Sequence, residues 1–488
     1  MPPAPVTIAT TSLHVAGRWL PAASGATFAA VDPATGVDLG AVALGDREDA
    51  QRALRAAHAA APTWAAASAF ERAAVLTRIG DRIAARREDL ARALTADQGK
   101  PLRAEAYDEV DELLAYWRMA AADATRLDGL MPPSVDARKR ILVQRVPRGV
   151  VAVITPWNWP YTMAAELLAP ALAAGNTVVW NPARHTSLCS VRLAECIVDA
   201  DLPPGVFNLV TGPGDTVGDE LAGDPLTSAV GFVGSTRTGL GIARRAAGKE
   251  LLLEMGGNGP LVVMDDADLD AAVAATLAAC YLNAGQSCTA GERILVHHRV
   301  HDRYVAALAD AVATRVRLGD PLDDATTMGP LNNETTAAKT AHHVAEAVAA
   351  GARVVRGGHR APDLGSPLFF QPTVLDGVTE GMAVAREETF GPVAPVTTVA
   401  DLDEALAIVN ASRFGLLSAI FTRDLRRGLA FAEAARSGWV NINEGTNYWE
   451  SHLPFGGRSG SASGLGRVGG RYALERLTEL KTIVVNLA

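Results

Sequence analysis

Residues 150–182 read VVAVITPWNWPYTMAAELLAPALAAGNTVVWNP and contain the repeating unit of the fold. An apolar run opens the stretch, a turn rich in Trp and Pro follows, and an Ala- and Leu-rich segment long enough for one helix leads to a second apolar run. The alternation continues downstream, so four apolar runs are expected as strands: 150–154, 177–180, 206–210 and 228–233. Strands that alternate with single helices predict a parallel, doubly wound sheet.

The segments on either side extend the same α/β pattern. Apolar residues at helical spacing predict helices over 47–62 and 70–98. The chain ends in KTIVVN (481–486), a strand that either closes the chain's own sheet or pairs across a subunit boundary. A second alternation after residue 255 indicates a second α/β domain, with helix 271–284, strand 293–296, helices 301–316 and 335–351, and strand 352–355.

The composition excludes several classes of protein. Of the 488 residues, 49% are hydrophobic and 20% charged, the balance of a soluble globular protein. With 45 basic and 54 acidic side chains the net charge is −9, which argues against a nucleic-acid partner. No uncharged apolar stretch reaches the roughly 18 to 20 residues of a membrane span.

The cysteines and the N-terminus favour a cytoplasmic protein. Cys189, Cys196, Cys280 and Cys288 lack zinc-site spacing and are too few for a disulfide framework. No metal is therefore expected, and reduced thiols are typical of the cytosol. The first residues, MPPAPVTIATTSLHV, have neither the basic region nor the long apolar region of a secretory signal.

Cys288, in NAGQSCTAGER, is a candidate nucleophile. Small neighbours let the backbone turn tightly and leave space for a substrate beside the sulfur. Sulfur is intrinsically nucleophilic, and a local positive field would favour the thiolate. The alternative is a buried structural cysteine.

Two polar residues stand where apolar runs end. Glu254 follows three leucines and precedes Gly256 and Gly257; desolvation there raises a carboxyl pKa towards the range of a general base. Asn158, in ITPWNWP, is held between tryptophans and prolines, and its amide is suited to an oxyanion hole. A surface Glu and a turn-forming Asn are the respective alternatives.

The stretch 234–239 (GSTRTG) follows an expected strand and opens a helix. Glycines and hydroxyls at a helix N-terminus can bind a pyrophosphate. The stretch is neither G-x-G-x-x-G nor a Walker loop, so an ordinary strand-to-helix turn would look similar.

Together these features resemble the aldehyde dehydrogenase superfamily over nearly the whole chain. The Glu254-to-Cys288 separation of 34 residues also fits that family. The matching blocks, in order, are TPWNWP (155–160), GNTVVWNP (175–182), GFVGSTRTG (231–239), LEMGGNGP (253–260), NAGQSCTAGER (283–293), EETFGPV (387–393) and PFGG (454–457).

The resemblance implies an α/β fold of three parts: a Rossmann-like cofactor domain (1–122 and 149–255), an α/β catalytic domain (256–453), and a β oligomerisation arm with the C-terminal strand (123–148 and 454–488). Homodimers or homotetramers are usual in such a family.

The resemblance also implies a mechanism. The Cys288 thiolate adds to an aldehyde, and the Asn158 amide and the Cys288 backbone N–H hold the alkoxide. Hydride transfer to NAD or NADP leaves a thioester, which water activated by Glu254 hydrolyses. The cofactor-binding positions implied are Thr155, Trp157, Asn181, Ala183, Arg184, Gly214, Gly234, Ser235, Glu388 and Phe390.

One block departs from the family pattern in a way that bears on the cofactor. The usual Lys-Pro-Ser-Glu reads Asn181-Pro182-Ala183-Arg184. A guanidinium at 184 could clamp the 2′-phosphate of NADP; alternatively Arg184 points to solvent and cofactor choice is loose. Both cofactors stay open.

The substrate positions implied are Trp159, Met163, Glu166, Ser287, Thr289, Tyr448, Trp449 and Phe455. Aromatic walls suit an apolar, aryl or cationic aldehyde, and Glu166 disfavours an anionic semialdehyde. Glu166 could instead face a neighbouring helix and touch no substrate.

Three rival classes remain. A CoA-acylating relative is disfavoured because it would not need Glu254 to activate water. A cofactor-free cysteine esterase would need a His base, and none occurs in the matched blocks. A binding protein on a retired enzyme fold would not be expected to keep Cys288, Glu254 and Asn158 together.

Overall fold

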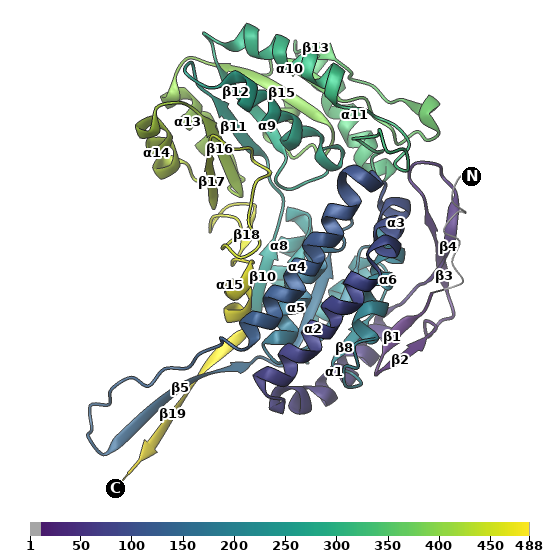
Figure 1. Cartoon of the computed structure of the whole chain (residues 1–488), viewed down its shortest axis with the longest axis vertical. Helices are drawn as coiled ribbons and strands as arrows, with labels where there is room; N and C mark the ends of the chain where they lie inside the picture. Colours follow the sequence, from purple (N-terminus) through teal and green to yellow (C-terminus); the bar gives the residue numbers. More distant parts are fainter. Residues whose placement is uncertain (1–10, 488) are drawn as a thin grey trace.

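The computed structural model describes residues 11–487. Figure 1 shows two α/β lobes, with a two-stranded arm that projects from the lower one and carries the C-terminus. Residues 1–10, on which the expectation of no signal sequence partly falls, lie outside the described part. No helix between residues 11 and 487 combines the length and apolar composition of a membrane span.

The first lobe is built on an eight-stranded sheet of order β18-β10-β9-β6-β7-β8-β1-β2. The five strands from β10 to β8 are mutually parallel, and β18 and β1 pair antiparallel at the two sides. The predicted parallel sheet is therefore confirmed. The strands are β1 (Leu13–Val15), β2 (Arg18–Leu20), β6 (Val150–Thr155), β7 (Thr177–Pro182), β8 (Phe207–Leu209), β9 (Thr227–Val233), β10 (Glu250–Glu254) and β18 (Gly464–Leu465).

Helices cover this sheet, and its largest apolar core lies between β6–β7 and the bundle α2, α4, α5 and α6. The expected single helix over 70–98 is wrong in one respect, because it divides at Arg86, whose side chain turns to an ion pair with Glu195. The helices are α1 (Arg47–Ala66), α2 (Ala69–Ala85), α3 (Arg87–Gln98), α4 (Tyr107–Ala124), α5 (Thr162–Ala173), α6 (Ser187–Val198), α7 (Asp219–Gly223) and α8 (Thr236–Arg245).

The second lobe holds a seven-stranded sheet of order β13-β14-β15-β12-β11-β16-β17, parallel except for β13. The second α/β unit expected after residue 255 is confirmed. Its strands are β11 (Gly259–Val263), β12 (Gly291–His297), β13 (Arg353–Arg356), β14 (Thr373–Asp376), β15 (Val393–Val399), β16 (Leu417–Phe421) and β17 (Trp439–Ile442). Its helices are α9 (Leu269–Tyr281), α10 (His301–Arg315), α11 (Glu334–Ala349), α12 (Ala383–Arg386), α13 (Leu402–Ala411) and α14 (Leu425–Ala434).

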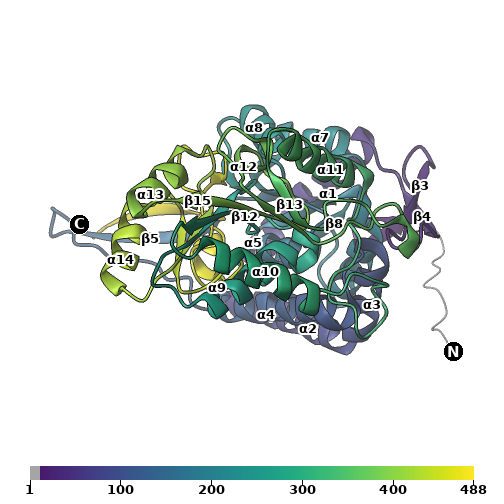
Figure 2. The same ribbon diagram turned by 90° about the horizontal axis from the view of Figure 1, so that it is seen from above.

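The arm consists of β5 (Lys139–Pro147) and β19 (Thr478–Asn486), paired antiparallel along their whole length. Between PFGG and the arm, β18 joins the first sheet and α15 (Gly470–Arg476) packs on α5. The segment 454–488 thus contributes to the first lobe as well as to the arm. The arm and the β3–β4 hairpin (Thr27–Val31 and Asp38–Ala43) lie at opposite ends of the molecule (Figure 2).

Candidate functional site

The candidate site lies where the parallel strands of the first sheet end. In the register, Ile154 is opposite Asn181 and Phe232, and Glu254 is opposite Val233. The residues that follow each strand therefore meet at one carboxyl edge, which is where open α/β sheets bind ligands.

A cavity of about 200 Å³ at this edge contains the candidate nucleophile. A narrower cavity of about 50 Å³ also reaches Cys288 and shares Met163 with the first. The sulfur therefore stands between two spaces. Predicted site residues that line the larger one are Trp157, Asn158, Gly234, Ser235, Glu388 and Phe390.

The loop before Cys288 is held in a tight left-handed turn. Asn283, Ala284 and Gly285 have φ of 51°, 53° and 72°, so the expected close turn is confirmed. Two of the three have a side chain, and such residues rarely adopt this conformation without support. Asn283 has that support: Gln98 donates to its side-chain oxygen at 2.9 Å, and its backbone N–H donates to Glu105 at 2.9 Å.

The surroundings of Cys288 do not favour the thiolate. Burial raises the pKa of the Cys288 thiol well above its ordinary value, and the nearby carboxyls of Glu388, Glu254 and Glu166 raise it further. Glu254 and Glu388 were each recognised in the sequence as candidate site residues. That the fold brings both close to the Cys288 sulfur could not be seen there. The resting group is consequently a thiol.

Gly257 fixes the position of the nucleophile's backbone. A Cβ at this position would overlap the carbonyl oxygen of Cys288. The Gly257 N–H donates to Glu388 Oε1 at 2.8 Å. Only a residue without a side chain lets the 256–257 segment pass between Cys288 and Glu388.

Asn158 lies beside Cys288 with its amide partly engaged. Its Nδ2 donates to the carbonyl of Gln286 at 3.0 Å, and its backbone carbonyl accepts from Asn283 Nδ2 at 2.8 Å. An amide nitrogen has two hydrogens, so one remains for a ligand in the cavity. The side chain is buried and its orientation is fixed by the same loop that carries the nucleophile.

Glu254 ends β10 in a buried position. Burial raises the pKa of its carboxyl well above the ordinary value, Glu166 raises it further, and Arg467 opposes the shift. Neither carboxyl oxygen has a hydrogen-bond partner within residues 11–487. A Cβ on Gly456, in the PFGG block, would stand 2.6 Å from Glu254 Oε1. The carboxyl is thus packed against glycine backbone and keeps its hydrogen-bonding capacity for a small molecule such as water.

The 387–393 block is anchored by a carboxylate that sequence reasoning missed. Glu292 accepts the backbone N–H of Phe390 at 2.7 Å and that of Thr389 at 2.9 Å. Phe390 has φ of 61°, a conformation that this pair of hydrogen bonds holds in place. Burial raises the pKa of Glu292 to about 8. Phe390 meets the Trp157 ring edge-to-face, with centroids 5.5 Å apart.

Two further missed residues come from α11. Lys339 and Thr336 line the cavity that contains Cys288, and Lys339 Nζ lies 5.9 Å from the centre of the Phe390 ring. They fall roughly fifty positions after the nucleophile, in a helix with no motif of its own, so no local signal marks them.

The predicted phosphate loop opens α8 as expected. Ser235 is the N-cap residue and its Oγ accepts from the Thr238 N–H at 3.3 Å. Gly234 and Ser235 line the cavity. The N-terminus of α8 therefore lies at the edge of this cavity, and a helix N-terminus is suited to bind an anion.

The remaining predicted cofactor residues lie outside this cavity. The Asn181 amide is turned inward, where Nδ2 donates to the carbonyl of Val210 at 2.9 Å. Thr155 Oγ1 accepts from Trp180 Nε1 at 2.9 Å. Ala183 is half-buried, and a Cβ on Gly214 would meet open space. Arg184 is exposed, and its guanidinium lies 4.8 Å from the centre of the Phe28 ring.

The narrower cavity brings together most of the predicted substrate residues. Tyr448 does not line it: its side chain is 46% exposed and its hydroxyl donates to Glu450 at 2.8 Å. Lining residues that sequence reasoning missed are Glu112, Leu282 and Asn447. Predicted substrate residues that do line it are Trp159, Met163, Glu166, Ser287, Thr289, Trp449 and Phe455.

A buried ion pair supports the wall of this cavity. Lys100 and Glu109 pair with both side chains fully buried, and Lys100 Nζ lies 3.3 Å from the centre of the Trp159 ring. Glu109 also accepts the backbone N–H groups of Tyr161 at 3.0 Å and Thr162 at 3.3 Å. The pair thus fixes Trp159 and the start of α5 together.

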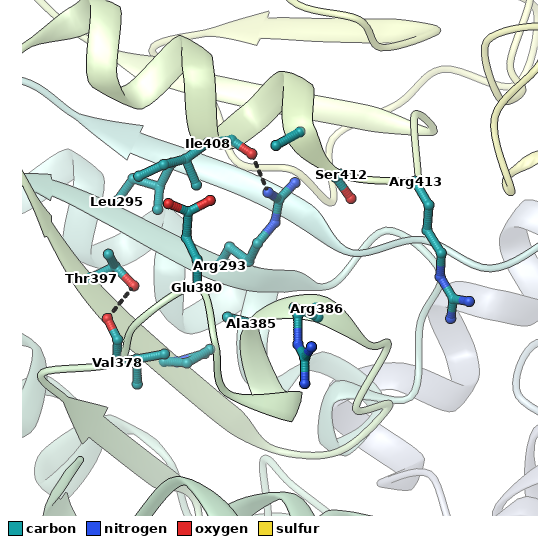
Figure 3. A pocket seen from close by; sticks show the side chains of 12 residues that line it. Arg293, Leu295, Val378, Glu380, Ala385, Arg386, Thr397, Ile408, Ser412 and Arg413 are labelled. Carbon is teal, nitrogen blue, oxygen red and sulfur yellow. Dashed lines mark hydrogen bonds between the residues drawn. The ribbon is translucent and has the colours of Figure 1, made fainter. Parts of the chain in front are cut away.

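A separate cavity of about 290 Å³ lies in the second lobe (Figure 3). Its lining includes the buried Arg293, which donates to the Ile408 carbonyl at 3.0 Å, and the exposed Arg386 and Arg413. It contains no cysteine. Within residues 11–487 no group of three His, Cys, Asp or Glu side chains could hold a metal ion.

Comparison with known proteins gives one consistent result. The sequence profile of one family, described as the aldehyde dehydrogenase family, matches residues 19–483. The chain is 41% identical over 473 residues to an NADP-linked succinate-semialdehyde dehydrogenase from Escherichia coli, covering 96% of this chain and 97% of that one. It is 41% identical over 469 residues to a 3-sulfolactaldehyde dehydrogenase from Pseudomonas putida, covering 96% and 95%.

A solved structure agrees in fold. Betaine aldehyde dehydrogenase from Staphylococcus aureus, in complex with NAD+, superposes with a TM-score of 0.94 at 34% identity, covering 98% of this chain and 95% of that chain. The similarity extends over both lobes and the arm.

Proposed function

The chain belongs to the aldehyde dehydrogenase family, and on that premise we propose that Cys288, Glu254 and Asn158 carry out its reaction. The enzyme oxidises an aldehyde to a carboxylic acid with NAD or NADP, through a cysteine thioester. The observation that carries the assignment of residues is the position of Cys288 between two cavities. One suits a cofactor and the other an aldehyde.

Cys288 acts as the nucleophile after it loses its proton. Its pKa is raised by burial and by three carboxyls, so this proton loss is favoured by higher pH. The sulfur then forms a bond to the aldehyde carbon. The free amide hydrogen of Asn158 and the backbone N–H of Cys288 donate to the resulting oxyanion, which preorganised donors stabilise.

Glu254 acts in the second half of the reaction as the general base. Its carboxylate takes a proton from water while the water oxygen attacks the thioester carbon. The C–S bond breaks, the acid leaves, and Cys288 recovers its proton. The raised pKa of Glu254 brings this group nearer to neutral pH than an exposed carboxyl, and only the ionised form works as a base.

The larger cavity fits NAD or NADP. The first turn of α8, which begins directly after Ser235 at the edge of this cavity, offers N–H groups for the pyrophosphate. Glu388 offers a carboxylate to ribose hydroxyls, and Phe390 and Trp157 form an aromatic corner. When bound, the cofactor supplies the hydride acceptor and a positive ring charge.

We propose residues 1–122 and 149–255 as the cofactor domain and 256–453 as the catalytic domain.

The cofactor preference rests on Arg184. Its guanidinium is exposed and lies over Phe28, which limits its freedom, so we propose that it receives the 2′-phosphate of NADP. Arg184→Ala should lower the ratio of kcat/KM for NADP over NAD about tenfold, because one charge-assisted contact contributes about 1.5–3 kcal/mol. An unchanged ratio would reject the clamp.

Pre-steady-state kinetics test the residue roles. Cys288→Ala should abolish oxidation while cofactor binding persists. Glu254→Gln should keep a burst of cofactor reduction equal to the active sites and lose steady-state turnover about 10²-fold or more. Full activity of Cys288→Ala would refute the mechanism. A CoA-dependent product, or esterase turnover without cofactor, would favour one of the rival reactions.

The arm is proposed to join copies of this chain into a homodimer or homotetramer. Leu480, Val484 and Val485 are exposed on β19, and Leu130 and Met131 lie exposed next to β5. Exposed apolar strands favour pairing with another subunit. Val484→Asp should lower the mass in light scattering, while an unchanged mass would argue against the arm as the contact.

A cytoplasmic location is also proposed. The four cysteines are free, and three of them are buried, a state that a reducing compartment maintains.

A further inference from the structure

The narrower cavity has two carboxyl groups in a wall that also contains three aromatic rings. Glu112 from α4 and Glu166 from α5 both line it, opposite Trp159, Trp449 and Phe455. No Arg, Lys or His contributes to the wall. A channel for purely apolar aldehydes would gain nothing from a buried carboxyl at Glu166 and a half-buried one at Glu112, since the desolvation of carboxyls is costly.

Each carboxyl is fixed by one neighbour and keeps one oxygen for a ligand. Tyr116 donates its hydroxyl to Glu166 Oε1 at 3.1 Å, and Thr162 donates to Glu112 Oε2 at 3.0 Å. The second oxygen of each carboxyl has no hydrogen bond among the described residues. Neither oxygen is completely inaccessible to solvent. Both carboxyls line the cavity, and each keeps one oxygen without a hydrogen bond.

The cation nearest to this wall is already engaged. Lys100 is paired with Glu109 and lies over one face of Trp159. Neither Glu112 nor Glu166 has an ion-pair partner within residues 11–487. The wall therefore has carboxyl groups without a cationic partner, together with aromatic rings. An ammonium group can pair with the carboxylates and also make cation–π contacts with the rings.

We propose that the aldehyde of this enzyme is a short ω-amino aldehyde, whose ammonium group binds between Glu112, Glu166 and the aromatic wall while its carbonyl reaches Cys288. This inference rests on the proposed function of Cys288. The cavity volume of about 50 Å³ accommodates about four water-sized groups, at roughly 10–15 Å³ each. That favours a chain in which two or three methylene groups and a primary ammonium occupy the cavity beyond the carbonyl, over a bulky quaternary ammonium.

Because Glu112 and Glu166 change charge with pH, the preference for an ammonium substrate should depend on pH. Burial raises the pKa of Glu112 to about 7 and that of Glu166 to about 8. Glu109 raises the pKa of Glu112 further, while Lys100 lowers it. Glu112 in turn raises the pKa of Glu166, which the hydrogen bond from Tyr116 lowers. Below these pKa values the carboxyls are neutral, and above them they are charged. Preference for an ammonium should therefore rise with pH.

The test compares three aldehydes of similar length: 3-aminopropanal, neutral propanal and anionic succinate semialdehyde. For the unmodified enzyme we expect kcat/KM for 3-aminopropanal to exceed that for propanal at least about tenfold, as one hydrogen bond to a charged group gives. The ratio should increase between pH 6 and pH 8.5. A higher kcat/KM for propanal or succinate semialdehyde would overturn the inference.

Variants locate the effect. Glu166→Gln should lower the 3-aminopropanal to propanal ratio at least about tenfold, and Glu166→Asp should recover part of it. The exposed Glu433→Gln serves as the matched control with an unchanged ratio. An unchanged ratio in Glu166→Gln, with the melting temperature preserved, would refute the role of this residue. Absence of oxidation of every aldehyde would instead count against the proposed function.

Discussion

Replacing Gly456 by Ala tests the placement of the Glu254 carboxyl without changing the Glu254 side chain itself. The new Cβ would stand 2.6 Å from Glu254 Oε1, whereas ordinary contact begins at 3.4 Å. Side-chain Cβ contacts below 3.0 Å are essentially never seen, so the carboxyl oxygen must move by about 0.4 Å at least, and by about 0.8 Å to reach ordinary contact. Gly456 also has φ of +148°, so the added side chain strains the backbone, by about 1–3 kcal/mol.

A displacement of about 1 Å from reactive geometry can lower a rate about 10²-fold. If Glu254 activates water, the loss falls on thioester hydrolysis alone. We expect Gly456→Ala to show a burst of cofactor reduction equal to the number of active sites, followed by steady-state turnover reduced about 10²-fold.

The assay is stopped-flow detection of the reduced cofactor, with Gly241→Ala as the control. A Cβ on Gly241 would meet no atom within 4 Å, so that variant should behave as the unmodified enzyme. Turnover of Gly456→Ala within twofold of the unmodified enzyme would refute the reasoning. Loss of the burst would show that the substitution disturbs Cys288 instead.

Two predictions concern stability. Lys100→Met leaves Glu109 buried without its cation, and such a change costs about 3–5 kcal/mol; urea unfolding should show it, and a loss below about 1 kcal/mol would contradict the importance of the pair. Burial raises the pKa of Glu105 from 4.5 to about 7, so the folded chain keeps a proton that the unfolded chain releases. The stability contributed is full below about pH 4.5 and is lost as pH rises through 7. The melting temperature should therefore fall from pH 5 to pH 8, and Glu105→Gln should flatten this slope; an equal slope in both proteins would reject the assignment.

The sequence predicted elements whose signal is local. The apolar runs at 150–154 and 228–233 became parallel strands because hydrophobic pattern and intervening helix length suffice for that. The small residues around Cys288 correctly indicated a tight turn, since the turn depends on the residues within it.

The remaining features depend on distant partners. The pKa of the Cys288 thiol is raised by carboxyls from three separate segments, which no window of sequence brings together. Glu292 follows the nucleophile closely, but its role as an anchor appears only when Phe390 folds against it. Tyr448 was counted with its neighbour Trp449, yet only the Trp turns into the cavity.

The support of Asn283 has a consequence for the order in which the enzyme becomes reactive. Asn283 is joined to Gln98 and Glu105, which lie 185 and 178 positions earlier, and Asn332 closes the same network by donating to the carbonyl of Gln98. Contacts so distant in sequence form slowly. The turn before Cys288 is thus built from contacts between distant parts of the chain, and the cysteine gains its shaped surroundings only when segments of the two lobes have come together.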